Sequence, residues 1–126
     1  MRAYVDSDPL IWLIRGDHRA TRFFQRLAAG RDNLWIGATQ RVEIVFHLRT
    51  AEVPNAQELL LQFQTQPVTE EIVDYAAVLY RQWHPSHGSD VNDCILAATA
   101  LLTGGKIYTL NTKHYPMPDL AVARAW

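Results

Sequence analysis

The sequence predicts an α/β fold in which a central, mainly parallel β-sheet is flanked by helices. Short apolar segments with strand character alternate with longer segments whose apolar residues recur at helical spacing, an order typical of parallel sheets covered on both faces. The 126 residues suffice for one hydrophobic core and are too few for two. We therefore expect a single domain over residues 1–126.

The expected elements follow from apolar spacing and from the residues that begin and end helices. Strands are expected at residues 2–5, 34–38, 67–69, 106–110 and 120–123. Helices are expected at residues 9–15, 19–29, 39–49, 56–64, 70–83 and 90–103, and a loop at 84–89. The expected helix caps are Ser7 or Asp8 for the first helix, Thr39 for the third and Asp90 for the last. Two glycines, Gly104 and Gly105, end the last helix.

Composition excludes several classes of protein. The net charge is −1, so the chain lacks the global basic character of a nonspecific nucleic-acid binder. The longest apolar runs are far too short to span a bilayer, and the opening residues lack a signal-peptide hydrophobic region, so we expect a cytoplasmic protein without a membrane partner. The one cysteine, Cys94, excludes an internal disulfide and is expected to be a small core residue.

Basic residues are unevenly distributed. Ten of the twelve are arginine, and four of these cluster near the N-terminus: Arg15, Arg19, Arg22 and Arg26. Arginine is well suited to bidentate contacts with phosphate or carboxylate groups. The cluster is therefore either a solvated helix face or a surface that binds phosphates or a partner.

Four polar side chains converge on one edge of the expected sheet. Asp6 and Asn111 each directly follow a strand, and Glu43 and Asp93 lie near helix N-termini, which share that edge in such folds. Three carboxylates and an amide are suitable oxygen ligands for Mg²⁺, with Mn²⁺ as an alternative ion. Such an ion activates water and stabilises charge during phosphodiester cleavage.

Each residue alone also has an ordinary structural explanation. Asp6 or Asp8 could simply cap the first helix, and capping is the favoured role of Asp8 and of Asp90. Asp93 and Glu43 could simply favour the helix dipole. Asn111 could be a turn former. The shared edge is what favours a functional site. His84 and His87 are expected to belong to a solvent-exposed loop rather than to a metal pair.

Several segments resemble the PIN-domain family, in particular the VapC-type toxins of toxin–antitoxin pairs. The resemblance rests on YVDSDPLIWLIRG, TQRVEIVFHLR, NDCILAATALLTGGKIYTLNTKHY and PDLAV, and so extends over nearly the whole chain. It implies a PIN-like three-layer fold and a magnesium-dependent endoribonuclease that cleaves RNA. It also implies a cognate antitoxin partner, a homodimer, and contact with DNA only through the antitoxin. By position, Asp6, Glu43 and Asp93 match the three main acids of the family, Asn111 falls where the family has Asp or Asn, and Asp90 matches an additional acid of second rank.

The chain departs from the family pattern in ways that leave alternatives open. Asn111 lowers the negative charge of the site by one, which favours one metal ion over two, and Tyr115 stands where Phe is usual. A catalytically weak PIN module could act mainly by binding an antitoxin and in transcriptional autoregulation. The strand followed by Asp6 and Asp8 also resembles HAD-type phosphatases, with Asp6 as nucleophile and Asp8 as acid/base. That family also requires a downstream lysine and an acidic pair, whereas here Lys106 lies on the late strand and Asn111 replaces an acid.

Overall fold

Five parallel strands form the single sheet of the computed structural model, which describes residues 1–126. The strands are β1 (Arg2–Val5), β2 (Asn33–Gly37), β3 (Gln64–Gln66), β4 (Gly105–Thr109) and β5 (Ala121–Arg124). Their order in the sheet is β3-β2-β1-β4-β5, and every neighbouring pair is parallel. The central position of β1 places Asp6, the residue that follows it, in the middle of the C-terminal edge of the sheet.

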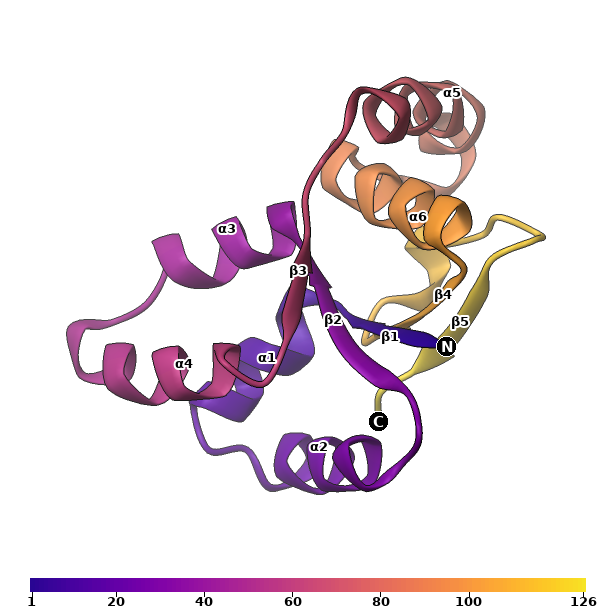
Figure 1. Cartoon of the computed structure of the whole chain (residues 1–126). Coiled ribbons are helices and arrows are strands. Elements are labelled where there is room, and N and C mark those ends of the chain that lie inside the picture. The colour runs from indigo at the N-terminus through magenta and orange to yellow at the C-terminus, as the bar shows by residue number, and fades with distance from the viewer.

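Helices cover both faces of the sheet, as Figure 1 shows. The helices are α1 (Ser7–Ile14), α2 (His18–Ala29), α3 (Ala38–Phe46), α4 (Val53–Leu60), α5 (Glu70–His87) and α6 (Val91–Thr103), with 3₁₀ turns η1 (Thr50–Glu52) and η2 (Thr112–His114). Residues of α5 and α6 pack on one face around Tyr4, and residues of α1 to α4 pack on the other around Val5. Adjacent strand residues point to opposite faces, so β1 contributes to both cores. The three-layer α/β prediction is confirmed. None of the helices is both long enough and apolar enough to cross a membrane.

Helix α6 is fixed at both ends by the residues expected from the sequence. The Asp90 side chain accepts a hydrogen bond from the Asp93 N–H, and the Asp93 side chain accepts one from the Asp90 N–H. This reciprocal pair satisfies two backbone donors that an uncapped helix would leave free. Gly104 ends the helix at φ 80°, a conformation that other residues rarely adopt. A Cβ on Gly105 would collide with the Tyr4 ring, so glycine lets β4 lie against this core residue.

Of the candidate caps of the first helix, Asp6 is the one that caps α1, because its side chain accepts from the Ser7 N–H at 2.8 Å. Two other helix starts differ from the sequence prediction. Gly37 rather than Thr39 precedes α3, which ends at Phe46, and α4 begins at Val53 with a proline at the start of the helix.

Two segments have a different secondary structure from the one expected. The third strand is Gln64–Gln66 rather than 67–69, because Pro67 has no N–H for a ladder and the polar segment before it pairs with β2. Residues 84–87 extend α5 instead of forming a loop, although Pro85 lies within them. His84 stacks on Tyr80 at 4.5 Å between ring centroids, and Gly88 ends the helix at φ 67°. Ring stacking and a glycine cap together stabilise this last turn.

Candidate functional site

Two carboxylates from distant parts of the chain meet at the C-terminal edge of the sheet. The Tyr115 hydroxyl donates to Oδ2 of Asp6 at 2.9 Å and to Oδ1 of Asp93 at 3.3 Å. Asp6 follows the central strand, whereas Asp93 lies in the first turn of α6. The fold therefore brings together two of the acids that the sequence placed at this edge.

Asp6 is held in place by three hydrogen bonds. Its Oδ1 accepts from the Ser7 N–H, and its Oδ2 accepts from the hydroxyls of Thr109 at 2.9 Å and Tyr115. Burial raises the pKa of Asp6 above its usual value, although these hydrogen bonds act in the opposite direction. Asp6 is thus a fixed carboxylate whose charge has no cationic partner in the chain.

Asp93 lies between the helix cap and a histidine. Its Oδ2 accepts from the Asp90 N–H and is 3.2 Å from Nδ1 of His114. Burial, followed by the negative charges of Asp90 and Asp6, raises the pKa of Asp93 to about 6, while hydrogen bonding to the Asp90 backbone and the charge of His114 act to lower it. Asp90 itself is engaged as the cap of α6.

Glu43 is the third acid of this edge and the least restrained. It lies in the middle of α3, is half-buried, and its carboxylate takes part in no hydrogen bond or ion pair within the chain. Burial, together with the negative charges of Asp6, Asp90, Asp8 and Asp93, raises its pKa to about 7. The repulsion from four other acids shows that Glu43 faces the same concentration of negative charge.

Asn111 reaches the acids through an intermediate residue. Its N–H donates to Oγ1 of Thr109 at 3.1 Å, and its side-chain amide is 2.9 Å from Nδ1 of His114. Since His114 also contacts Asp93, Asn111 orients a neighbour of the acids and does not contact them directly. This arrangement gives Asn111 a positioning role in the structure.

Three further site residues were not identified from the sequence: Thr109, His114 and Tyr115. All three lie in the segment TLNTKHY, which begins with the last residue of β4 and continues into the loop at the site edge. This position is the signal by which the sequence could have indicated them. Ser89 also links this segment to the end of α5, since its hydroxyl donates to the His114 carbonyl at 2.7 Å. Among the basic residues, Arg15 pairs with Glu52 at 3.3 Å, whereas Lys113, two positions after Asn111, is exposed.

The oxygen donors of this edge suit a hard cation bound through water. No three histidine, cysteine or acidic side chains lie close enough together to form a ready-made metal cage. Mg²⁺ keeps several of its waters and is usually bound by one or two carboxylates, so it does not require such a cage. Asp6, Asp93 and Glu43 offer only oxygen atoms, and their mutual repulsion is relieved by a positive charge placed among them.

Comparisons with known proteins agree over nearly the whole chain. A sequence profile of the family described as "PIN domain" matches residues 3–120. The chain is 36% identical over 115 residues to Ribonuclease VapC10 of Mycobacterium tuberculosis, which covers 90% of this chain and 85% of that relative. It is 27% identical over 118 residues to Ribonuclease VapC19 of the same organism, covering 92% of this chain and 94% of that relative.

Solved structures share the fold at lower sequence identity. A toxin–antitoxin complex from Klebsiella pneumoniae contains a chain that matches with a TM-score of 0.81 and 22% identity, over 98% of both chains. VapBC2 from Rickettsia felis, solved with a DNA fragment from its promoter, matches with a TM-score of 0.80 and 15% identity over 98% of both chains. These similarities show the common architecture.

Proposed function

Because this chain belongs to the PIN-domain family, we propose that it is a magnesium-dependent endoribonuclease of the VapC type, the toxin of a toxin–antitoxin pair. The observation that carries the proposal is that the Tyr115 hydroxyl joins Asp6 and Asp93 at one edge of the sheet. The raised pKa of Glu43, to which the charges of both acids contribute, supports its inclusion as the third acid. The curated relatives named as ribonucleases support the same activity.

In this proposal the acids hold one divalent cation, Mg²⁺ or Mn²⁺, partly through water. Asp6 and Asp93 are the fixed ligands, Glu43 is the mobile one, and Asp90 remains the helix cap. When bound, the cation supplies positive charge beside the scissile phosphate and makes a nearby water more acidic.

The chain itself positions these groups. Thr109 and Tyr115 donate to Oδ2 of Asp6, and the Asp90 N–H donates to Oδ2 of Asp93, beside His114. Asn111 restrains His114. Glu43 has no hydrogen bond to break before it can turn toward a cation or its water shell. Carboxylates that are fixed by their neighbours in this way bind and orient a cation better than freely rotating carboxylates do.

An exposed apolar surface supports a protein partner. Phe46 is 78% exposed and Leu61 86% exposed, and Val42 and Val45 of α3 and Trp12 of α1 are also exposed. Val45 and Leu61 line the same cavity. Apolar side chains gathered in this way mark interaction sites. We assign this surface of α1, α3 and the end of α4 to a cognate antitoxin or to a second copy in a homodimer, with DNA reached only through the antitoxin.

A second candidate function is a PIN module with little catalytic activity that acts by binding its antitoxin and in transcriptional autoregulation. The contact of Asn111 with His114, rather than with the acids, is the observation that favours it. The HAD-type alternative is rejected, because Asp8 is exposed and Lys106 points its Nζ at the Tyr108 ring, 5.1 Å from its centroid. The family match independently excludes it.

Incubation of the purified protein with total RNA separates the two remaining functions. A nuclease produces discrete new RNA ends in Mg²⁺ and none in EDTA, and sequencing of those ends identifies the substrate. Cleavage that persists in EDTA would contradict the metal-dependent proposal. Absence of cleavage in both conditions, with an intact fold, would favour the binding module.

A further inference from the structure

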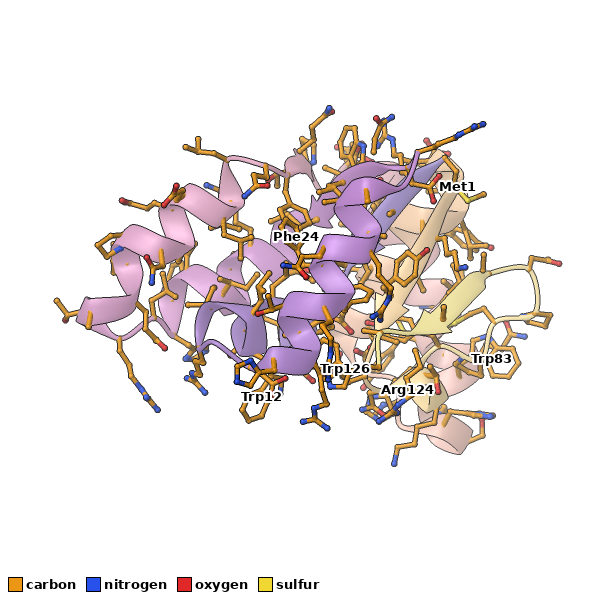
Figure 2. The ribbon with its side chains drawn as sticks, turned by 90° about the horizontal axis from the view of Figure 1, so that it is seen from below. Met1, Trp12, Phe24, Trp83, Arg124 and Trp126 are labelled. Carbon is orange, nitrogen blue, oxygen red and sulfur yellow. The ribbon has the colours of Figure 1, made fainter.

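A cavity of about 330 Å³ lies between α2 and the β4–β5 side of the sheet. Its apolar floor includes Phe23 and Tyr108, whose rings are 5.6 Å apart. Three arginines line it, namely Arg26 of α2, Arg31 of the following loop and Arg124 of β5. Figure 2 shows Arg124 and Trp126 toward one end of α2 and Met1 toward the other.

No aspartate or glutamate side chain neutralises these three guanidinium groups. Arg26 and Arg31 make no hydrogen bond or ion pair within the chain. Arg124 donates to the carbonyl of Leu110 at 2.9 Å and to the main-chain oxygen of Trp126, the last residue of the sequence, at 2.7 Å. The one acid in the lining, Asp32, lies 3.5 Å from the terminal amino group of Met1. The cavity therefore carries an excess of positive charge beside an apolar floor, where water screens charge less well.

One end of the cavity adjoins the candidate site. Arg124 pairs in the sheet with Thr109, whose hydroxyl holds Asp6, and its guanidinium contacts the carbonyl just before Asn111. The other end lies at Asp32, just before Asn33, which pairs with Arg2 of β1, as Gly105 does on the other side of that strand. From Gly105 to Thr109 β4 advances by four residue steps, or about 13 Å at about 3.3 Å per residue. This length is greater than that of a single phosphate group.

We propose that this arginine-lined cavity binds the sugar–phosphate backbone of single-stranded RNA next to the bond that is cut. The inference extends the proposed ribonuclease function, because it assumes that RNA reaches the three acids. Arg124 contacts the phosphate nearest the site, and Arg26 and Arg31 contact phosphates further along the strand. The aromatic floor carries a ribose or base, as in other sites for single-stranded nucleic acids. The planar guanidinium group of arginine is suited to paired hydrogen bonds with phosphate oxygens. Arg26, one of the four clustered N-terminal arginines, therefore has a binding role in this proposal and is not only a solvated side chain.

RNA binding in EDTA tests the cavity separately from cleavage. The probe is a labelled single-stranded RNA of about 16 nucleotides and mixed sequence, a length that exceeds the cavity. The variant Arg26→Ala/Arg31→Ala removes two exposed side chains without removing a hydrogen bond, so the fold is retained. Arg81→Ala is the matched control, since Arg81 is an exposed arginine of α5 on the opposite face of the sheet.

The double variant is expected to bind this RNA about tenfold more weakly or worse, because each lost contact is a hydrogen bond to a charged group. The slope of log K against log salt should fall in magnitude by about 1.4, which is two phosphate contacts on a single strand. Arg81→Ala should match the wild type. Equal weakening by Arg81→Ala, or wild-type binding by the double variant, would overturn the proposal. So would displacement of the RNA by polyglutamate at equal charge concentration, which would assign the cavity to an acidic protein segment.

Cleavage assays on the same proteins distinguish the two proposals. If the wild type cleaves RNA and the double variant binds RNA as well as the wild type does, the cavity proposal is wrong and the nuclease proposal stands. If the double variant loses RNA binding and the wild type does not cleave RNA in Mg²⁺, the cavity proposal stands and the nuclease proposal is wrong.

Discussion

The Tyr115 hydroxyl is 2.9 Å from Oδ2 of Asp6, and it is the one side chain that contacts two of the three site acids. Tyr115 is buried, and burial together with the adjacent carboxylates raises its pKa well above the usual value. The phenol therefore stays protonated and donates across the working pH range. Through this one group, the end of β1 and the start of α6 are fixed relative to each other.

Replacement of Tyr115 by Phe is expected to lower the free energy of unfolding by about 1–3 kcal/mol near neutral pH, because a hydrogen bond to the partly buried carboxylate of Asp6 is lost. Cleavage should persist at a reduced rate, since the ring still packs. Urea denaturation measures the first effect. Tyr75→Phe is the control, because the Tyr75 hydroxyl makes no hydrogen bond within the chain. Equal stability of the Tyr115→Phe protein and the wild type would show that the contact contributes nothing.

The pKa of Glu43 makes the metal-free protein sensitive to pH. The pKa is raised from 4.5 when unfolded to about 7 when folded, so the folded state binds the proton more tightly. Stability contributed by this group is present below pH 4.5 and is lost as the pH rises through about 7. In EDTA at about pH 8, Glu43→Gln should be more stable than the wild type by about 1 kcal/mol, a value reduced for solvent screening of a half-exposed group.

Urea denaturation at about pH 5 and about pH 8 checks this sign, since the difference between the Glu43→Gln protein and the wild type should shrink at the lower pH. Glu58→Gln supplies the control, because Glu58 is exposed on α4 and makes no hydrogen bond. A Glu43→Gln protein less stable than the wild type at the higher pH would contradict the repulsion seen at this edge.

Substitution of Asp90 separates capping from metal binding. Asp90→Ala should lower the free energy of unfolding by about 1 kcal/mol, because the Asp93 N–H loses its acceptor. Asp90→Ser restores a capping oxygen and should regain most of that stability together with full cleavage. Thermal denaturation and an RNA cleavage assay on both variants provide the measurements. Loss of cleavage in a stable Asp90→Ser protein would make Asp90 a ligand.

The charge deficit at Asn111 can be reversed. Asn111→Asp adds a fourth carboxylate beside His114, and the greater negative charge should tighten divalent cation binding by about tenfold. Isothermal titration with Mn²⁺ reports both the affinity and the number of ions bound. Unchanged affinity would show that position 111 acts only by orienting His114.

The sequence predicted those features that depend on local patterns. Asp6 and Asn111 could be placed because each follows an apolar strand, and the Asp90 cap follows from its spacing to Asp93. The strand at Gln64–Gln66 has no apolar alternation, since its pairing with β2 arises from the tertiary fold. The final turn of α5 contains a proline, so local propensity predicted a loop where ring packing sustains a helix.

Contacts between distant residues were beyond the reach of the sequence alone. Tyr115 and Asp6 are separated by 109 positions, and no local pattern shows that the hydroxyl of one meets the carboxylate of the other. The meeting of Arg124 and Arg26 on one cavity likewise depends on the packing of β5 at the side of the sheet next to α2. Long-range packing therefore determines how the acids are held, whereas the local pattern determines which edge they occupy.

Titration of Mn²⁺ into the metal-free protein, followed by the electron paramagnetic resonance of the free ion, tests most directly whether the acids form a metal site. The comparison uses the wild type, Asp93→Asn and Asp74→Asn, where Asp74 is an exposed acid of α5 without hydrogen bonds. We predict saturable binding by the wild type and Asp74→Asn, and at least about tenfold weaker binding with loss of RNA cleavage in folded Asp93→Asn. Wild-type Mn²⁺ affinity in Asp93→Asn would contradict the account.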